Sequence, residues 1–321
     1  MSTPQSNTNV LGIACVLGAT VFFSLNDISI KFLADGYPLH QIVFIRALTA
    51  MVLTLTIIMP FEGGFQNLRT RRPWIHALRG FMVVVANTAF FAAIAAMPLA
   101  DASAIFFVAP LFITGLSVVV LHETVGPRRW IAVLVGLLGV IVVVGPGNSS
   151  FAFVSLLPVV AALAYASMQI MTRMMGISEK ASTMSFYIQL SFLLFCGTLG
   201  LALGDGRFSG SDNPALEFFL RPWAWPTPLD LTIMLFLGAV SAGAGYLISQ
   251  AYRAAEAGLI APFEYTALIL AVFWGITLWG EWPSAATWLG IALIAGSGIF
   301  VALREAQLGA KPSAKRVGGR R

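Results

Sequence analysis

The stretch ADASAIFFVAPLFITGLSVVVLHETVGPRRWIAVLVGLLGVIVVV, residues 100–144, decides the fold class. It contains two apolar runs, about 100–121 and 128–145, and the short turn between them carries Glu123 and two arginines. A hydrocarbon core about 30 Å thick needs roughly 20 apolar residues of helix. Backbone in lipid must satisfy its own hydrogen bonds, and neither run alternates as a β-barrel strand would. Each run therefore predicts a transmembrane helix.

Runs of this kind recur along the whole chain of 321 residues, which is 58% hydrophobic and only 10% charged. Soluble domains are about 25% charged, so the composition excludes a soluble enzyme, a disordered chain and a nucleic-acid-binding domain. We expect an all-α integral membrane protein, with membrane lipids and no nucleic acid among its partners. The ten predicted transmembrane helices cover about 11–33, 40–60, 75–97, 100–121, 128–145, 152–173, 183–204, 230–252, 258–280 and 285–303.

The basic residues predict the orientation of these helices. Fourteen of the 19 Lys and Arg residues fall in one set of alternate loops and termini, three fall in the other, and Arg46 and Arg79 lie within helices. Basic loops stay in the cytoplasm, so both termini are expected there, which agrees with an even number of helices. Residues 304–321 then form a basic cytoplasmic tail, better suited to anionic lipid than to nucleic acid.

The chain also contains an internal repeat. Residues 102–144 can be laid on residues 260–302 at a shift of 158, which places Glu123 on Glu281 and Trp130 on Trp288. Five helices then follow five helices, with repeats at 11–146 and 152–303. Because five is odd, the second repeat must be inverted in the membrane, and inverted repeats are the basis of many secondary transporters.

A long external loop at 205–229 interrupts the second repeat. It carries four prolines together with Trp223 and Trp225. Tryptophan beside a helix end is typical of a segment that rests at the membrane interface. The alternative interpretation is a lid over a binding site.

Several motifs resemble the EamA-type repeat of the drug/metabolite transporter superfamily: Pro98–Ala104, Ala109–Phe112, Glu123, Arg128–Trp130, Gly136 and Gly139, and also Phe23–Asp27 with Lys31 and Arg46. The resemblance implies ten helices as two inverted repeats in a bacterial inner (plasma) membrane. It also implies transport of a small organic solute. The pattern is similar to branches that take up riboflavin or S-adenosylmethionine, and more loosely to amino-acid exporters, so the substrate stays open.

Ionisable groups inside a membrane are expensive and are candidates for function. Asp27 lies about six residues inside the outer end of the first helix, beside Asn26. It either pairs with Lys31 on the same helical face or faces a central cavity and binds a cation or a proton. Arg46, in the second helix, suits a carboxylate or phosphate, or it neutralises Asp27.

Two further charges lie in other helices. Arg79 is expected to be structural, near the cytoplasmic end of the third helix, while Asn87, deeper in that helix, is a candidate cavity amide. Glu264 is the candidate for proton coupling; the alternative is an ion pair with Arg253 or Arg79.

Polar stripes at helical spacing add uncharged candidates. Tyr165 and Gln169 share a face with Thr172, and Tyr246 shares one with Gln250. Such stripes either line a wet cavity or bond between helices. Trp274 is interpreted as a stacking surface or, more commonly, as a lipid-facing residue.

Other features limit the function. Glu123 and Glu281, with Lys31 and Arg79, are expected to make structural ionic contacts, and no metal or cofactor motif is present. The predicted function is secondary transport by alternating access, with protons as a further candidate partner and no enzyme activity. The alternative is a membrane-embedded lipid-modifying enzyme, but Asp27 and Glu264 lie toward opposite faces, too far apart for a cooperating carboxylate pair.

Overall fold

The computed structural model describes residues 4–122, 127–144, 154–175, 179–254 and 263–309. Within these ranges every regular element is a helix, which confirms the expected all-α class. Seven helices are long and apolar enough to cross a membrane, and three shorter apolar helices cover Trp130–Val144, Thr266–Trp279 and Ala285–Ser297. The described part of the chain is thus a polytopic helical membrane protein, and the count of ten spans stays a prediction.

The first half of the chain runs through α1 (Pro4–Leu33), α2 (Leu39–Leu53), a π-helical turn (Thr54–Ile58), α3 (Met59–Phe61), a 3-10 turn (Phe65–Leu68), α4 (Pro73–Ala96), α5 (Leu99–Phe106), α6 (Ala109–Leu121) and α7 (Pro127–Val144). The second half runs through α9 (Leu156–Met175), α10 (Ala181–Leu203), α11 (Pro214–Leu220), α12 (Pro228–Ala254), α14 (Thr266–Trp279) and α15 (Ala285–Gly309).

The run predicted as one helix at 100–121 is broken in the structure. α5 ends at Phe106, and α6 begins at Ala109. Pro110 lies in the first turn of α6, where its missing N–H costs no helical hydrogen bond. The break places irregular backbone in the middle of an apolar span, which lipid tolerates only where protein or a cavity surrounds it.

Loop contacts define the two faces of the bundle. The Nε2 of Gln41 donates to the carbonyl oxygen of Ala224 at 2.6 Å, and the Nη1 of Arg221 donates to that of Ala34 at 2.5 Å. The end of α1, the start of α2 and the segment between α10 and α12 therefore lie on one face, which we call the Lys31 face.

The opposite face, which we call the Glu62 face, joins the α3–α4 segment to the start of α10. The backbone N–H of Ser182 donates to Oε2 of Glu62 at 3.0 Å, and the Oγ1 of Thr70 donates to Oε1 of Glu179 at 2.7 Å. Successive long helices thus connect the two faces alternately, as in a chain that crosses a membrane repeatedly.

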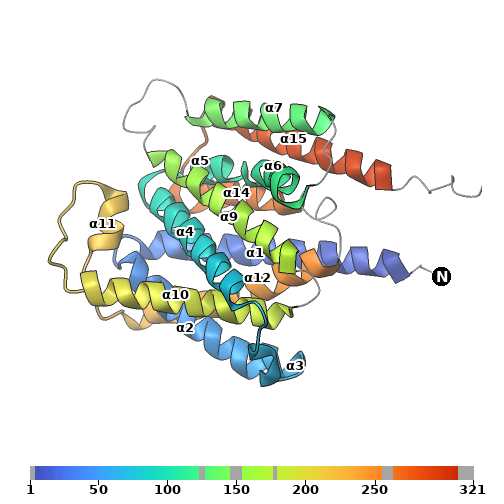
Figure 1. Ribbon diagram of the computed structural model, residues 1–321. Coiled ribbons are helices and arrows are strands. Elements are labelled where there is room, and N and C mark those ends of the chain that lie inside the picture. Colours follow the sequence, from blue (N-terminus) through green and yellow to red (C-terminus); the bar gives the residue numbers. More distant parts are fainter. Residues whose placement is uncertain (1–3, 123–126, 145–153, 176–178, 255–262, 310–321) are drawn as a thin grey trace, which may run out of the picture.

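The helices pack in pairs that repeat across the two halves of the chain. In this comparison α1 corresponds to α9, α2 to α10 and α4 to α12. The contact of α1 with α12 then matches that of α9 with α4, and the contact of α2 with α12 matches that of α10 with α4. α2 also packs on α10, and α7 packs on α15 along one edge of the molecule (Figure 1). At that edge Gly139 and Gly290 meet, and a Cβ on either glycine would lie within 3.0 Å of the other's carbonyl oxygen. The pairings are those expected if the two halves exchange places.

The 205–229 segment is anchored rather than free. Trp223 packs against His40, with ring centres 6.0 Å apart, and against Gly200 of α10 and Gly204 just after it. Trp225, by contrast, is 99% exposed. None of this segment lines the cavity described below, so the structure favours the interfacial interpretation over a lid.

Candidate functional site: a cavity with buried polar groups

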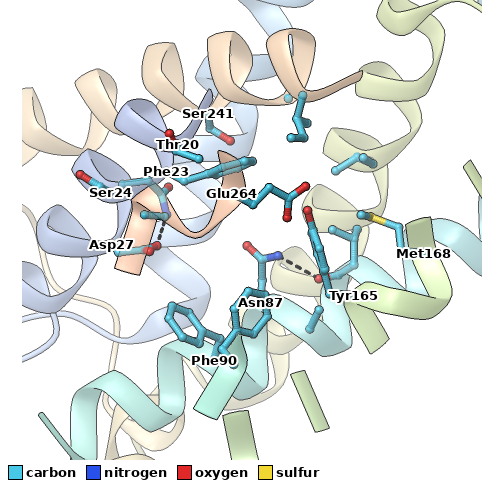
Figure 2. Close-up of a pocket in the computed structure, with 18 of the residues that line it drawn as sticks. Thr20, Phe23, Ser24, Asp27, Asn87, Phe90, Tyr165, Met168, Ser241 and Glu264 are labelled. Atoms are coloured by element: carbon cyan, nitrogen blue, oxygen red, sulfur yellow. Dashed lines mark hydrogen bonds between the residues drawn. The ribbon is translucent and has the colours of Figure 1, made fainter. Parts of the chain in front are cut away.

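A cavity of about 200 Å³ lies in the centre of the bundle, enclosed by helices of both halves (Figure 2). α1, α2, α4 and α5 contribute from the first half, and α9, α10, α12 and α14 contribute from the second. Seven of the eight predicted substrate or coupling residues line it: Asn26, Asp27, Arg46, Asn87, Tyr165, Gln169 and Glu264. Most of the cavity wall is apolar, and these charged and polar groups interrupt it. A small organic solute with both apolar and polar parts could be bound by such a wall.

Asp27 and Arg46 are connected through Asn26. The Nη1 of Arg46 donates to Oδ1 of Asn26 at 3.0 Å, and the Nδ2 of Asn26 donates to Oδ1 of Asp27 at 3.1 Å. The amide thus accepts from the cation and donates to the carboxylate. This relay, Arg46–Asn26–Asp27, replaces the direct clamp that the sequence suggested.

The guanidinium of Arg46 packs against two aromatic rings. Its Cζ lies 4.9 Å from the ring centre of Phe192 and 5.5 Å from that of Phe91, and the residue is only 2% exposed. A cation over an aromatic face gains most where water is excluded. The arginine therefore has a fixed position in the wall of the cavity.

Lys31 does not pair with Asp27, which was one of the two interpretations of that carboxyl group. Its Nζ lies 2.7 Å from Oε1 and 2.9 Å from Oε2 of Glu281, in the turn before α15. The Oε2 of Glu281 also accepts the backbone N–H of Leu99 at 3.0 Å, at the positive end of α5. The contact joins three elements on the Lys31 face, and neither charged residue lines the cavity.

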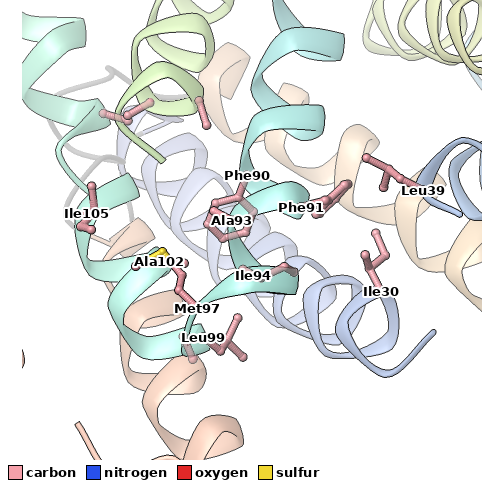
Figure 3. Packing of buried hydrophobic residues seen from close by; sticks show 14 of the residues in the cluster. Ile30, Leu39, Phe90, Phe91, Ala93, Ile94, Met97, Leu99, Ala102 and Ile105 are labelled. Atoms are coloured by element: carbon pink, nitrogen blue, oxygen red, sulfur yellow. The ribbon is translucent and has the colours of Figure 1, made fainter. Parts of the chain in front are cut away.

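Apolar packing lies behind this ion pair. Ile30 near the end of α1, Leu39 at the start of α2, and Ile94 and Leu99 at the α4–α5 junction are each at most 3% exposed. Figure 3 shows these side chains, together with Met97, as members of one buried apolar cluster. The ion pair and the packed apolar side chains thus lie together on the Lys31 face.

Glu264 lies at the other end of the cavity, just before α14. Its Oε1 accepts a short hydrogen bond from the hydroxyl of Tyr252, and the hydroxyl of Tyr165 is directed at the same carboxyl group (Figure 2). The residue is 7% exposed. Its partners among the described residues are neutral hydroxyls rather than a cation.

Arg79 does not pair with Glu264. Its Nε donates to Oγ1 of Thr172 at 2.7 Å, and its Nη1 donates to the carbonyl oxygen of Met184 at 3.1 Å. These bonds join α4 to α9 and α10. Arg79 lines the cavity, but its donors serve helix packing. The side chain of Arg253, the other proposed partner, lies outside the described residues.

The remaining uncharged candidates differ in position. Tyr165 accepts from Nε2 of Gln169 at 2.7 Å, within the cavity wall. The Nδ2 of Asn87 donates to the carbonyl oxygen of Val83 at 3.1 Å, while its side chain faces the cavity. Tyr246 is not among the lining residues. Its hydroxyl accepts from Nε2 of Gln250, which also donates to Glu62 at the Glu62 face. Glu123 lies outside the described residues.

Sequence reasoning missed several lining residues. Ser185 and Gln189 of α10 both line the cavity and are each at most 3% exposed. Their spacing of four residues is the same signal that identifies Tyr165 and Gln169. Trp274, for which a lipid-facing position is the commoner expectation, instead lines the cavity, and its indole N–H donates to Oγ of Ser24 at 2.9 Å.

Comparisons with known proteins agree with this geometry. The EamA-like transporter family matches residues 10–145. A riboflavin transporter of Vibrio cholerae is 32% identical, covering 79% of this chain and 81% of its own. A riboflavin transporter of Rhizobium johnstonii is 28% identical, covering 95% of each chain. A Rickettsia prowazekii S-adenosylmethionine uptake transporter is 23% identical, covering 93% of this chain and 94% of its own.

A solved structure supports the fold. One crystal structure superposes with a TM-score of 0.66 at 17% identity, and the match covers 94% of this chain and 99% of the other. At that identity the likeness extends to the arrangement of helices and not to the solute.

Proposed function

Because this chain belongs to the EamA-like transporter family, we propose that it carries a small organic metabolite across a bacterial inner membrane by alternating access. One observation carries the proposal: buried charged and polar side chains from both halves of the chain enclose a cavity within an otherwise apolar bundle. Charged groups inside a membrane are costly and are retained where a polar solute passes.

The proposed architecture is ten transmembrane helices as two inverted repeats, 11–146 and 152–303. The matched helix pairs support it, because α1 with α12 corresponds to α4 with α9 when the halves are exchanged. Inverted repeats allow one arrangement to open to either side, with the solute site at the interface between repeats.

The proposed orientation places the Glu62 face and both termini in the cytoplasm. Arg69, Arg71, Arg72 and Lys180 all belong to segments on that face. Cytoplasmic loops carry an excess of such residues. The Lys31 face would then be external, and its ion pair with Glu281 would keep the external path closed in the conformation described.

In this mechanism the relay of Arg46, Asn26 and Asp27 binds polar groups of the solute, and Glu264 exchanges a proton. A carboxyl group whose partners are hydroxyls keeps its hydrogen bonds in both protonation states, because a hydroxyl donates as well as accepts. Opening of the Lys31–Glu281 contact would expose the cavity to the external side.

Uptake into proteoliposomes tests the proposal. We expect purified protein to accumulate labelled riboflavin, S-adenosylmethionine or an amino acid and to release it chemically unchanged. Asp27→Asn should lower uptake without loss of folded protein, and Asp35→Asn, at an exposed site on the Lys31 face, is the matched control. Chemical conversion of a lipid or solute would instead support a membrane enzyme.

A further inference from the structure

Two polar stripes line the cavity, and their hydrogen bonding differs. Tyr165, Gln169 and Thr172 follow α9, and their polar groups bond to one another, to Arg79 and to helix carbonyls. Ser185 and Gln189 follow α10, and the Oγ of the first and the Oε1 of the second have no hydrogen-bond partner among the described residues. The α9 stripe is satisfied by the protein, whereas the α10 stripe is not.

A third unpartnered atom lies beside the α10 stripe. Arg46 uses Nη1 to hold Asn26, but its Nε has no partner within the described part of the chain. Phe192, three residues after Gln189 on α10, packs its ring on the Arg46 guanidinium. Phe192 shares the helical face of Gln189, so the arginine packs on the same side of α10. An N–H donor and a carbonyl acceptor are thus without a partner in the wall of one cavity.

Leaving such groups unpaired is costly. A buried polar atom without a partner costs about 1–3 kcal/mol, so native proteins keep few of them. Ser185, Gln189 and Arg46 all line the same cavity and are each at most 3% exposed. A cluster of three in one cavity wall points to a ligand that supplies the missing partners.

The rest of the cavity wall specifies the shape of that ligand. Phe90, Phe106, Phe107 and Trp274 line it, and the indole of Trp274 is fixed through Ser24. Aromatic walls favour a flat ring, and an edge with an N–H donor beside an acceptor would pair with Gln189 and Arg46.

We propose that Ser185 and Gln189 of α10, with the Nε of Arg46, recognise the polar edge of a planar heteroaromatic substrate. The edge carries an N–H donor for Gln189 and a ring nitrogen or carbonyl acceptor for Arg46. This inference rests on the proposed transport function and assigns the solute class and the residues that select it.

Ligand binding to the purified full-length protein tests the assignment. The probes are riboflavin, followed by quenching of its own fluorescence, with S-adenosylmethionine and leucine as competitors. N3-methylated riboflavin, which lacks the edge N–H, is the matched ligand control. We expect the wild type to bind at least one aromatic probe, to prefer unmethylated over methylated flavin where flavin binds, and to be insensitive to leucine.

Gln189→Leu should weaken binding of the aromatic probe about tenfold, the equivalent of one buried hydrogen bond at about 1.4 kcal/mol. It should also abolish discrimination against the methylated flavin, or against an N6,N6-dimethylated adenine probe, which has no N6–H donor, where only S-adenosylmethionine binds. A purely structural role of Gln189 would not change the ratio between the affinities for the unmethylated and the methylated probe. Ser185→Ala should weaken binding less. Ser191→Ala, on the same helix but bonded to the Tyr187 carbonyl oxygen, should leave binding unchanged.

The inference is overturned if neither aromatic probe binds, if leucine competes equally, or if Gln189→Leu retains the wild-type discrimination. Transport of leucine without binding of an aromatic probe would remove this inference and leave transport itself intact. If the protein moves no solute, the proposed function is contradicted. The ratio between the affinities for unmethylated and methylated probe would still decide the role of Gln189.

Discussion

Two carboxyl groups line one cavity in different surroundings. Asp27 is linked to the Arg46 cation through the Asn26 amide, whereas Glu264 meets the hydroxyls of Tyr252 and Tyr165. A fixed cation favours a charged carboxylate, while hydroxyl partners serve either protonation state. The comparison teaches that two carboxyl groups in one cavity can have different partners. We expect those partners to decide which group holds a charge and which exchanges a proton.

The largest expected effect comes from removing the cation. Arg46→Met should destabilise the protein by about 3 kcal/mol, because the Asp27 carboxylate, which lies inside the bundle, loses the charge that balances it. Thermal unfolding of the purified protein would measure this. The double variant Arg46→Met/Asp27→Asn should recover much of the loss. If Arg46→Met alone unfolds at the wild-type temperature, the relay does not balance Asp27.

The next effect separates the two carboxyl groups by function. Glu264→Gln should reduce gradient-driven uptake at least about tenfold, the scale of one lost positioned acid–base group, yet leave solute exchange without a gradient largely intact. Asp27→Asn should reduce both kinds of transport. Uptake into proteoliposomes with and without an imposed proton gradient provides the measurement. Equal loss in both assays for Glu264→Gln would show that this residue is not the coupling group.

A smaller effect concerns the closure on the Lys31 face. Lys31→Met should cost about 1–2 kcal/mol, because the ion pair is partly buried and bidentate. Glu281→Ala should cost more than Glu281→Gln, since the amide oxygen can still accept the Leu99 N–H that caps α5. Thermal unfolding ranks the three variants. The same stability for the alanine and glutamine variants would remove the capping role of Glu281.

The smallest effect is expected at the hydroxyl partners of Glu264. Tyr252→Phe should destabilise the protein by about 1 kcal/mol, the net value of one hydrogen bond. It should also change the pH dependence of transport more than Tyr246→Phe, which alters a tyrosine of the same helix outside the cavity. Indistinguishable pH profiles would show that Tyr252 does not influence the Glu264 proton.

The fold class and most of the cavity could be predicted from the sequence. Long apolar runs have few alternatives to membrane helices, and polar residues within such runs are rare enough to identify individually. Asp27, Arg46 and Glu264 can therefore be identified from the sequence alone. Ser185 and Gln189 follow the same rule, but they lie near the start of an apolar run and carry no charge.

Partners distant in sequence could not be predicted. Lys31 and Glu281 are 250 residues apart, and the local rule of four-residue spacing favoured Asp27 instead. The break between α5 and α6 could not be predicted for a related reason, since hydropathy does not detect irregular backbone surrounded by protein. The interior position of Trp274 likewise depends on Ser24 of another helix.

Access to the cavity from each side of the membrane tests the central claim most directly. Ser241, on α12, lines the cavity and offers a site for a single cysteine in a variant whose Cys15 and Cys196 are replaced by alanine. We expect a membrane-impermeant thiol reagent to label Ser241→Cys from either side, with Lys31→Met increasing labelling from the Lys31 face. Labelling from one side only, with or without transported solute, would contradict alternating access.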